Sequence, residues 1–462
     1  EDIGFFTFTK QAVQEGKSRA MSRFGITNNQ LPFFRTLHSL CFFQLGLSKD
    51  SVMNGRDFND LNQKLNLRLT GSISSDDGHV SGISKDDRLM FIENLARMRQ
   101  ISLESQWHDS DDVVGWFELE RFANGLRLFK NDRLLIDYTD MLQLFLDRGR
   151  APKLDVMFVD EAQDLSPLQW AVVRKLCESA DRIYIAGDDD QAIYRWAGAD
   201  VDYLIRNSKN AMVLKQSYRI PKSIHTLAER CIGQVASRVQ KTWNPRKEAG
   251  HVSWEKSYES IDMETGDWLV LARTNYLLNG IEEHCRSEGW FYKTKNRNSV
   301  SEKKVKAVRD WETLRKGGEI PLVDLIKVLN YMRVSVPTSL ERNDFDSNIS
   351  FEEAQSYLPN LKQEYWYDLF DGISVSERSY IRAMLRRGEK ITKEPRIKLS
   401  TIHAAKGGEA ENVILLTDIS NRIYKSYQAN PDDESRVFYV GLTRAKQNLF
   451  LIEPQTQKYF QI

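Results

Sequence analysis

The 462-residue chain lacks several features that would assign it to a simple class. It has no net charge, with 65 basic and 65 acidic side chains, so no overall electrostatic field favours nucleic acid or a membrane surface. It has no apolar run of the eighteen or so residues that a membrane-spanning helix needs, and its first residues show no signal-peptide pattern. We therefore expect a protein that is neither secreted nor embedded in a membrane. A nucleic-acid surface, if present, must be a local groove.

Cysteine is scarce as well. The four cysteines, Cys41, Cys177, Cys231 and Cys285, lie far apart and form no C-x-x-C pair. Their spacing argues against a zinc site and favours free thiols in a reducing compartment. We expect all four to be small buried side chains.

The sequence also lacks a complete phosphate-binding loop. The tripeptide Gly-Lys-Ser at 16–18 matches only the end of the pattern G-x-x-x-x-G-K-[ST], because Gln11 stands where the first glycine is required. The strand-like run at 4–9 ends seven residues before the tripeptide, and residues 10–23 have the pattern of a polar helix. We therefore interpret the tripeptide as part of a helix. No other copy of the motif occurs.

What the sequence does contain is an alternation of short apolar runs and helical patterns. Such alternation is typical of parallel sheets covered by helices and predicts an α/β fold. The helical patterns include 167–179 and 221–239. The apolar runs, which we expect to be buried strands, lie at 4–9, 156–160, 182–187, 212–215, 268–273, 397–401, 413–418 and 448–452.

Two long stretches interrupt this rhythm. Residues 45–130 are polar at first and helical from about Asp86, and residues 296–392 are basic and then helical. We predict two cores, each with a mostly helical insertion. The first core comprises 1–44 and 131–208 with its insertion at 45–130, and the second comprises 209–295 and 393–462 with its insertion at 296–392.

The strongest chemical signal is Val-Asp-Glu-Ala-Gln-Asp at 159–164. An apolar strand ends there in Asp160 and Glu161, and open α/β sheets bind ligands at the carboxyl ends of their strands. One carboxylate can hold Mg²⁺ against phosphate oxygens, while the next can orient or deprotonate an attacking water. For an isolated acidic pair, a solvated loop is the alternative interpretation.

A second strand ends in Gly187 and three aspartates, followed by Gln191. A glutamine at this place can hydrogen-bond a γ-phosphate or the attacking water. Tyr194 and Trp196 follow closely, and aromatic faces near a basic residue suit base stacking, which contributes about 1–3 kcal/mol per base. Taken alone, Trp196 is more typical of a core.

These two segments resemble the UvrD/Rep/PcrA type of superfamily 1 DNA helicases, whose motifs read DE-x-Q-D and G-D-x-x-Q-x-I-Y-x-W-R-G-A. The resemblance spans nearly the whole chain outside the two insertions, and further motifs follow in the family's order. They are TFTKQAV at 7–13, RTLHS at 35–39, IDYTDML at 136–142, KQSYRIP at 215–221, LSTIHAAKGGEAENVIL at 399–415 and ESRVFYVGLTRAKQNLFL at 434–451.

The resemblance implies two RecA-like cores and an ATP-dependent helicase that moves 3′ to 5′ on single-stranded DNA and unwinds duplex. It implies ATP and Mg²⁺ as cofactors, and single-stranded DNA and single-strand/duplex junctions as partners. A monomer in the cytoplasm or at the nucleoid, serving DNA repair or replication, is the expected setting. Direction rests on family analogy alone.

Residue roles are carried over from the family motif by motif. For catalysis they are Asp160 as magnesium ligand, Glu161 as base, Gln191 as γ-phosphate sensor, and Arg219 and Arg444 as cations from the second core. For the nucleotide they are Tyr218 stacking on adenine, Glu409 at the ribose, Gln163 and Gly407. For the DNA strand they are Phe8, Thr36, His38, Tyr194, Trp196, Thr401 and His403. Without the resemblance, a histidine after a strand more often satisfies a loop hydrogen bond.

The sequence departs from the family in three places. Ala197 stands where arginine is usual, Gly408 stands where leucine is usual, and the phosphate loop that precedes the first motif in the family is missing. We hypothesise that the sequence lacks its N-terminal part; the alternative is an inactive relative that binds single-stranded DNA as a clamp. The basic run 303–309 is interpreted as a solvated helix face, with phosphate contact as the alternative.

Overall fold

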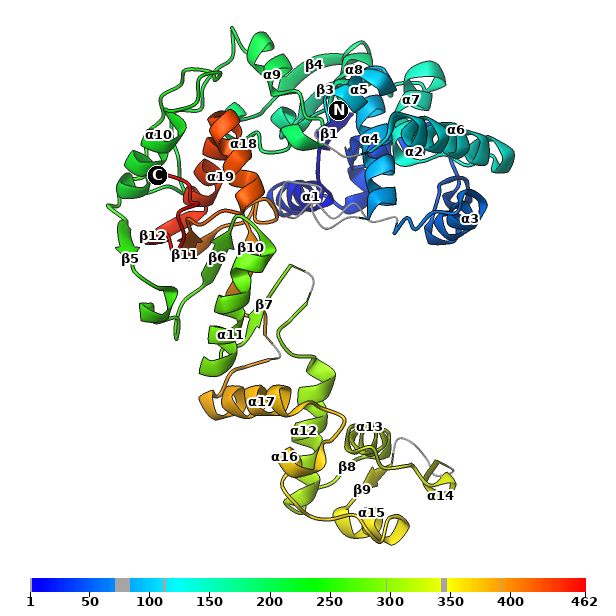
Figure 1. Cartoon of the computed structure of the whole chain (residues 1–462), viewed down its shortest axis with the longest axis vertical. Coiled ribbons are helices and arrows are strands. Elements are labelled where there is room, and N and C mark those ends of the chain that lie inside the picture. The colour runs from blue at the N-terminus through cyan, green and yellow to red at the C-terminus, as the bar shows by residue number, and fades with distance from the viewer. Residues whose placement is uncertain (1, 71–83, 111–113, 296, 342–346, 392) are drawn as a thin grey trace.

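The computed structural model describes residues 2–70, 84–110, 114–295, 297–341, 347–391 and 393–462. Two sheet-bearing cores lie next to each other, and an elongated helical arm extends from the second core (Figure 1). Chain termini N and C both lie within the cores rather than in the arm. The predicted fold class, α/β with two parallel-sheet cores and helical insertions, is confirmed.

The first core contains a four-stranded parallel sheet in the order β2-β1-β3-β4. Its strands are β1 (Ile3–Thr7), β2 (Phe34–Thr36), β3 (Leu154–Val159) and β4 (Ala180–Ile185). Its helices are α1 (Lys10–Phe24), α2 (Leu37–Gln44), α7 (Tyr138–Arg148), α8 (Pro167–Cys177) and α9 (Val201–Asn207). An apolar cluster between β3 and helices α2, α7 and α8 holds this layer together.

The second core contains a six-stranded parallel sheet in the order β5-β12-β11-β6-β10-β7. Its strands are β5 (His251–Glu255), β6 (Trp268–Ala272), β7 (Tyr292–Lys293), β10 (Ile397–Thr401), β11 (Ala410–Leu416) and β12 (Ala445–Ile452). Its helices are α10 (Lys222–Ile232), α11 (Asn279–Glu288), α18 (Asn421–Ala429) and α19 (Pro431–Leu442). All five residues of β6 are buried, as expected for a central parallel strand.

Both interruptions of the α/β pattern are mainly helical. The first contains α3 (Gly55–Leu65), α4 (Lys85–Arg99), α5 (Leu103–His108) and α6 (Trp116–Arg133), so its helices begin earlier than the expected Asp86. The second contains α12 (Glu302–Arg315), α13 (Leu322–Met332), α14 (Thr338–Glu341), α15 (Phe351–Tyr357), α16 (Trp366–Leu369) and α17 (Val375–Arg387), with a small pair β8 (Ile320–Pro321) and β9 (Asn348–Ile349). In the basic run, Lys304 pairs with Glu377 and Lys306 with Asp324, which supports the solvated-face interpretation.

The Gly-Lys-Ser tripeptide lies inside α1, as predicted. Thr9 caps this helix by accepting a hydrogen bond from the Ala12 backbone N–H at 3.1 Å. A Cβ added at Gly16 would lie 2.8 Å from the ring of Phe5, so this glycine permits close packing of α1 on β1. It does not form a phosphate loop.

Two predictions of regular structure are wrong. Residues 212–215 form no strand: Met212 and Leu214 are exposed on the connection between the two sheets, and none of the described strands pairs with this run. The helix predicted at 221–239 ends at Ile232. Residues after Gly233 instead form a loop whose side chains bind the first core, as shown below.

The expectation of full burial also fails for β4. Ile183, Tyr184 and Ile185 are 39%, 53% and 45% exposed, respectively. The reason is topological, because β4 pairs with β3 on one side and forms the edge of the sheet on the other. The strand itself is confirmed, and β3 is its only partner among the described strands.

The cysteines behave largely as expected. Cys41, Cys231 and Cys285 are buried, Cys177 is half-buried, and all four are free thiols. Burial raises the pKa of the Cys41, Cys231 and Cys285 thiols to about 12, so they are unreactive at neutral pH. Within the described part of the chain, no helix combines the length and apolarity required to cross a bilayer.

Candidate nucleotide site and nucleic-acid face

The end of β3 carries the acidic pair. The backbone N–H of Asp160 donates to the carbonyl of Phe6 on β1 at 2.8 Å, which fixes the turn at the carboxyl end of β3. Glu161 has a φ of 55°, a left-handed conformation that is uncommon outside glycine and clusters at functional sites. Burial and the adjacent Glu161 carboxylate raise the pKa of Asp160. Two carboxylates are thus held at the carboxyl end of the parallel sheet.

Gln163 links this turn to the end of β4. Its side chain is buried; the amide Nε2 donates to Glu161 Oε2 at 2.5 Å, and Oε1 accepts from the backbone N–H of Asp188 at 3.0 Å. The neighbouring strand continues into a short 3-10 helix, Asp189–Gln191. Gln163 therefore positions the two acidic loops relative to each other.

Gln191 meets an arginine from the second core. Arg444, between α19 and β12, donates from Nη2 to Gln191 Oε1 at 3.1 Å and from Nη1 to the carbonyl of Gly408 at 3.2 Å. Burial, and then the nearby positive charge of Arg219, lower the pKa of Arg444 to about 9. The guanidinium remains protonated at neutral pH, in a setting that gains from an added anion.

Arg219 and Glu409 form a looser, more exposed part of the site. Their charged groups are 3.6 Å apart, and Glu409 is also 3.6 Å from Lys446. Tyr218 is 88% exposed, so its ring is open for stacking. Gly407 has a φ of 80°, which glycine adopts without strain in the turn before Glu409.

Lys406 is the main site residue that sequence reasoning missed. Its ammonium group, from the second core, donates to Asp164 Oδ2 at 2.6 Å and to the carbonyl of Gln191 at 2.7 Å, and lies 3.6 Å from Glu161 Oε2. Burial raises the pKa of Asp164 to about 6, and Lys406 opposes this effect. The lysine of the pattern H-x-A-K-G was the available signal.

The donor set fits a magnesium ion that is completed by a nucleotide. Mg²⁺ in phosphate-transfer sites commonly takes one or two carboxylates, with water and phosphate oxygens filling the octahedron. Asp160 supplies such a carboxylate at the carboxyl end of β3. No group of three or more His, Cys, Asp or Glu side chains able to cage a metal occurs among the described residues.

Four aromatic side chains form a second surface close to this site. Phe8 and Tyr194 are stacked with ring centroids 5.7 Å apart, and the Tyr194 hydroxyl donates to the carbonyl of His403 at 3.2 Å. Trp196 stacks on Phe91 of α4, with centroids 6.2 Å apart. The structure thus brings together predicted DNA-contacting residues from three distant segments of the chain.

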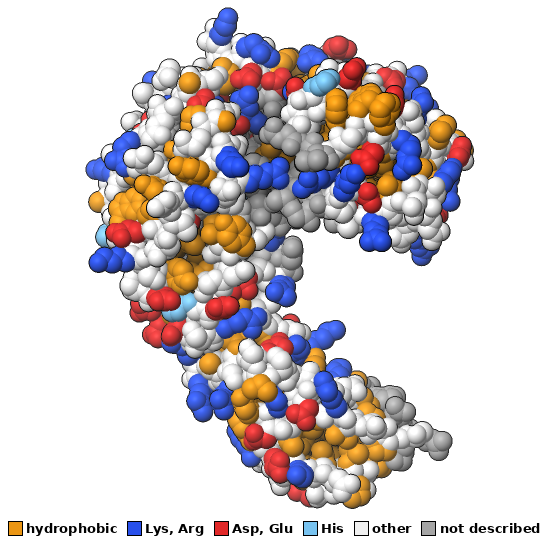
Figure 2. Space-filling model, viewed as in Figure 1, with side chains coloured by type: hydrophobic (Ala, Val, Ile, Leu, Met, Phe, Trp, Pro, Cys, Tyr) orange, Lys and Arg blue, Asp and Glu red, His pale blue; other side chains and the backbone are white. Residues whose placement is uncertain are grey.

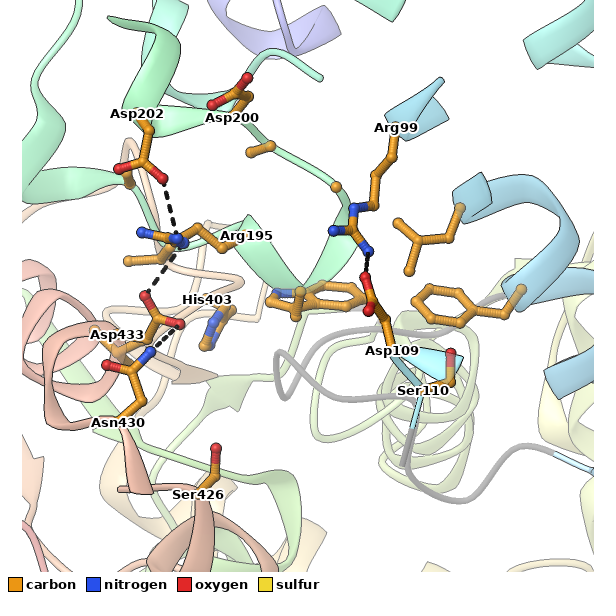
Figure 3. Close-up of a pocket in the computed structure, with 18 of the residues that line it drawn as sticks. Arg99, Asp109, Ser110, Arg195, Asp200, Asp202, His403, Ser426, Asn430 and Asp433 are labelled. Carbon is orange, nitrogen blue, oxygen red and sulfur yellow. Dashed lines mark hydrogen bonds and ion pairs between the residues drawn. The ribbon is translucent and has the colours of Figure 1, made fainter. Parts of the chain in front are cut away.

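A cavity of about 850 Å³ adjoins these rings, between α4, the loop after β4 and helices α18 and α19. Figure 3 shows His403 between Arg195 on one side and the Arg99–Asp109 pair on the other. Arg195 faces Asp202 at 3.3 Å and Asp433 at 3.7 Å. Figure 2 shows several Lys and Arg side chains near the boundary between the two cores, on a protein whose net charge is zero.

The remaining predicted DNA contacts have clear local roles. Thr36 accepts from the Ser39 N–H at 3.2 Å and caps α2, and Thr401 accepts from the Ala404 N–H at 3.3 Å. His38 lies edge-on to Tyr138, with centroids 6.0 Å apart, and burial lowers the pKa of its imidazole to about 4. A neutral His38 offers hydrogen bonds rather than charge at physiological pH.

At the boundary between the two parallel-sheet cores lie carboxylates, a glutamine and arginines, which are the groups that enzymes of phosphate transfer use. Family comparison makes the class specific. The UvrD/REP helicase N-terminal domain model matches residues 1–212, and the UvrD-like helicase C-terminal domain model matches residues 370–456. The chain belongs to the UvrD-like DNA helicases, a class of ATP-hydrolysing enzymes.

Curated relatives are distant but align along most of the chain. A probable DNA helicase II homolog of Mycoplasma capricolum is 23% identical, covering 96% of this chain and 77% of its own length. The ATP-dependent DNA helicase PcrA of Bacillus subtilis is 21% identical over 98% of this chain and 76% of its own length. The ATP-dependent DNA helicase srs2 of Schizosaccharomyces pombe is 23% identical over 98% of this chain and 66% of its own length.

Proposed function

We propose that the protein is an ATP-driven motor that moves 3′ to 5′ along single-stranded DNA and separates duplex strands. The observation that carries this proposal is the hydrogen bond from Arg444 to Gln191, which joins a second-core cation to the first-core loop beside the acidic pair. A site shared between two cores can couple phosphate chemistry to a change in their separation. We propose that it acts as a monomer in the cytoplasm or at the nucleoid.

The proposed chemistry assigns one task to each group. Asp160 would hold Mg²⁺, which when bound neutralises charge on phosphate oxygens. Glu161 orients and deprotonates the attacking water, and Gln191 contacts the γ-phosphate or that water. Arg444 and Arg219 face the transferred group, where a well-placed arginine contributes about 10³–10⁵ in rate. Tyr218 would stack on adenine and Glu409 would bind the ribose, with Gln163 and Gly407 shaping the site.

DNA binding is assigned to the aromatic surface. Phe8, Tyr194 and Trp196 present ring faces to successive bases, and His403, Thr401, Thr36 and His38 line the path with polar groups. In this structure Phe8 and Tyr194 stack on each other, so a base that enters between them must separate the rings. This opening is a site at which a bound strand can be gripped or released.

The proposed chemistry also requires a phosphate loop, and the edge of β4 offers it a place. This edge borders a cavity of about 1090 Å³ that is lined by apolar side chains, including Phe158 and Trp170, together with Asp160, Asp188 and Arg219. A further parallel strand beside β4 would end at the same side of the sheet as Asp188. We infer that this edge is the place at which a strand followed by a phosphate loop can pair with the sheet.

The proposed domain limits follow the two sheets. We assign 1–44 and 131–208 to the first core, and 209–295 and 393–462 to the second. Residues 45–130 and 296–392 are assigned as the two insertions. Helices α12 to α17 form an arm that extends beyond the second sheet and shares one apolar cluster with it, which supports the second assignment (Figure 1).

Single-strand-stimulated ATP hydrolysis tests the proposal. It is measured for this chain and for the product of the complete natural reading frame, each with its Glu161→Gln variant. The motor proposal predicts hydrolysis by the complete product and its loss in Glu161→Gln. If neither protein hydrolyses ATP while both bind single strands, the clamp alternative replaces it, and the catalytic roles are withdrawn.

A further inference from the structure

The loop that follows β4 belongs mechanically to the second core. Ile193 is buried in the apolar cluster that contains Ile220 and Ile224 of the second core. Arg436 of α19 is fully buried and donates from Nε to the carbonyl of Asp189 at 3.0 Å. A segment that is continuous in sequence with the first-core sheet is therefore packed onto the other core.

Ion pairs also connect the Asp188–Asp190 loop to the second core. Lys241, in the segment after α10, lies 2.7 Å from Asp188 Oδ1 and 3.0 Å from Asp190 Oδ2, and also contacts Asp189 Oδ1. Arg238 donates to both carboxylate oxygens of Asp190, at 2.8 and 2.6 Å. Three consecutive carboxylates are thus held by two cations, all in a single cluster.

The cluster depends on its lysine. Asp190 has no exposed surface, and the Lys241 side chain is only 12% exposed. Burial lowers the pKa of the Lys241 ammonium group, but the three carboxylates raise it by more, so the group stays charged. Removal of one partner from a buried charge cluster leaves the others uncompensated, which is far more disruptive than loss of a surface pair.

The same cluster controls the orientation of Gln191. Asp188 binds Lys241 through Oδ1 and accepts from Gln191 Nε2 through Oδ2 at 2.7 Å. With its amide nitrogen held in this way, Gln191 presents Oε1 to Arg444. The chain of contacts therefore runs from Lys241 through Asp188 and Gln191 to Arg444.

We propose that Lys241, assisted by Arg238, is a positioning residue for Gln191. It anchors the Asp188–Asp190 loop to the second core, so that Gln191 and Arg444 keep their mutual geometry when the cores move. The catalytic part of this inference rests on the proposed ATP-hydrolysing function. The anchoring part concerns the loop itself and holds whether or not ATP is hydrolysed.

The catalytic part is tested with Lys241→Met in the complete natural protein. A displacement of about 1 Å in a reacting group costs on the order of 100-fold in rate, so kcat for ATP should fall by about 10- to 100-fold. KM for ATP and the affinity for single-stranded DNA should change by less than about threefold, because the Lys241 ammonium group is already paired with three aspartates and is assigned to neither ligand. Lys241→Arg, which keeps the charge, should restore part of kcat.

Lys130→Met is the matched control. Lys130 is also a shielded lysine, 9% exposed, that binds two carboxylates, Asp137 at 2.6 Å and Asp140 at 2.5 Å. It lies in α6, away from the nucleotide site. Its replacement should lower stability without lowering kcat. An equal fall in kcat for both variants would show a merely structural effect and overturn the positioning role.

The anchoring part is tested by amide hydrogen exchange on this chain without nucleotide. In Lys241→Met, amides at 189–193 should exchange at least about tenfold faster, while those of β3 and β6 keep their parent rates. Arg238→Gln should give the same pattern, which covers the case that Lys241→Met does not fold. Unchanged exchange at 189–193 in the folded variants would overturn the anchoring. If the parent protein hydrolyses no ATP, the proposed function fails, and exchange alone then decides the anchoring.

Discussion

Strands β4 and β6 are both short, apolar and parallel, but their surroundings differ completely. β6 lies between β10 and β11, and all five of its residues are buried. β4 pairs with β3 alone among the described strands, and the side chains of Ile183, Tyr184 and Ile185 are exposed. The two strands differ in neighbours more than in composition. Because successive side chains of a strand point to opposite faces, both faces of β4 are open here, and its unpaired backbone edge is suited to a further strand.

The boundary between the cores also contains two kinds of surface, one formed by ion pairs and one that is largely apolar. The first surface comprises the ion pairs of Asp188–Asp190 with the second core, together with the Arg444–Gln191 hydrogen bond. The second surface is the largely apolar cavity next to Asp160, which Asp188, Gln191 and Lys241 also border. The first surface is complete in this structure. The second is an open surface that Asp160 of the proposed nucleotide site borders.

The largest expected effect concerns the contribution of the second core to chemistry. Arg444→Ala in the complete natural protein should reduce kcat for ATP by about 10³- to 10⁵-fold, because a fixed positive charge at the transferred phosphate is lost. Steady-state ATPase assays measure the change, and single-strand binding without nucleotide serves as the folding control. A reduction below tenfold in a folded variant would remove Arg444 from the catalytic site.

The next effect compares the two strands directly. Leu271→Ala in β6 removes a fully buried side chain and should lower the free energy of unfolding by about 2–5 kcal/mol. Ile185→Ala in β4 removes a side chain that is already 45% exposed and should cost less than about 1 kcal/mol in this chain. Urea unfolding of both variants makes the measurement. Equal losses would contradict the exposed-edge description of β4.

A smaller effect is expected at the aromatic surface. Trp196→Ala should weaken single-stranded DNA binding by about 1–3 kcal/mol, the usual contribution of one stacked base. Trp254→Ala, at an exposed tryptophan on β5, is the matched control and should leave the affinity unchanged. Fluorescence anisotropy with an oligothymidine reports both. Equal affinity of the Trp196→Ala variant and the parent would exclude this ring from the DNA path.

The smallest effect is the pH dependence contributed by His38. Burial lowers the pKa of the folded imidazole to about 4, below its unfolded value, so the stability that neutral His38 contributes is present at pH 7 and is lost as the pH falls. Between pH 7 and pH 5 the free energy of unfolding should fall by on the order of 1–2 kcal/mol more in the parent than in His38→Asn. Parallel unfolding curves for the two proteins would contradict the shifted pKa.

Much of this organisation could be predicted from the sequence because each catalytic segment is local. An apolar run followed by Asp160 and Glu161 specifies a strand and its acidic end, and α1 was predicted around Gly16 despite the Gly-Lys-Ser tripeptide. The failures are non-local. The run 212–215 has strand composition but no neighbouring strand, and the helix predicted to 239 ends early because its last residues bind the first core.

The two site lysines that the sequence did not reveal also depend on contacts between distant segments. Lys241 lies outside every motif identified in the sequence, and its proposed role depends on three aspartates about fifty residues earlier in the chain. Lys406 stands in a recognised motif, but only the folded structure shows that it reaches Asp164, Glu161 and Gln191 together. Spacing along one segment can indicate a strand end, whereas contacts between cores require coordinates.

The central claim is that carboxylates of the first core and arginines of the second core form one ATP-hydrolysing site. The most direct test is ATP hydrolysis stimulated by single-stranded DNA, measured side by side for this chain and for the product of the complete reading frame. Hydrolysis that is stimulated by single-stranded DNA and lost in Glu161→Gln is the predicted result. No hydrolysis by either protein, with single-strand binding retained, would contradict the claim.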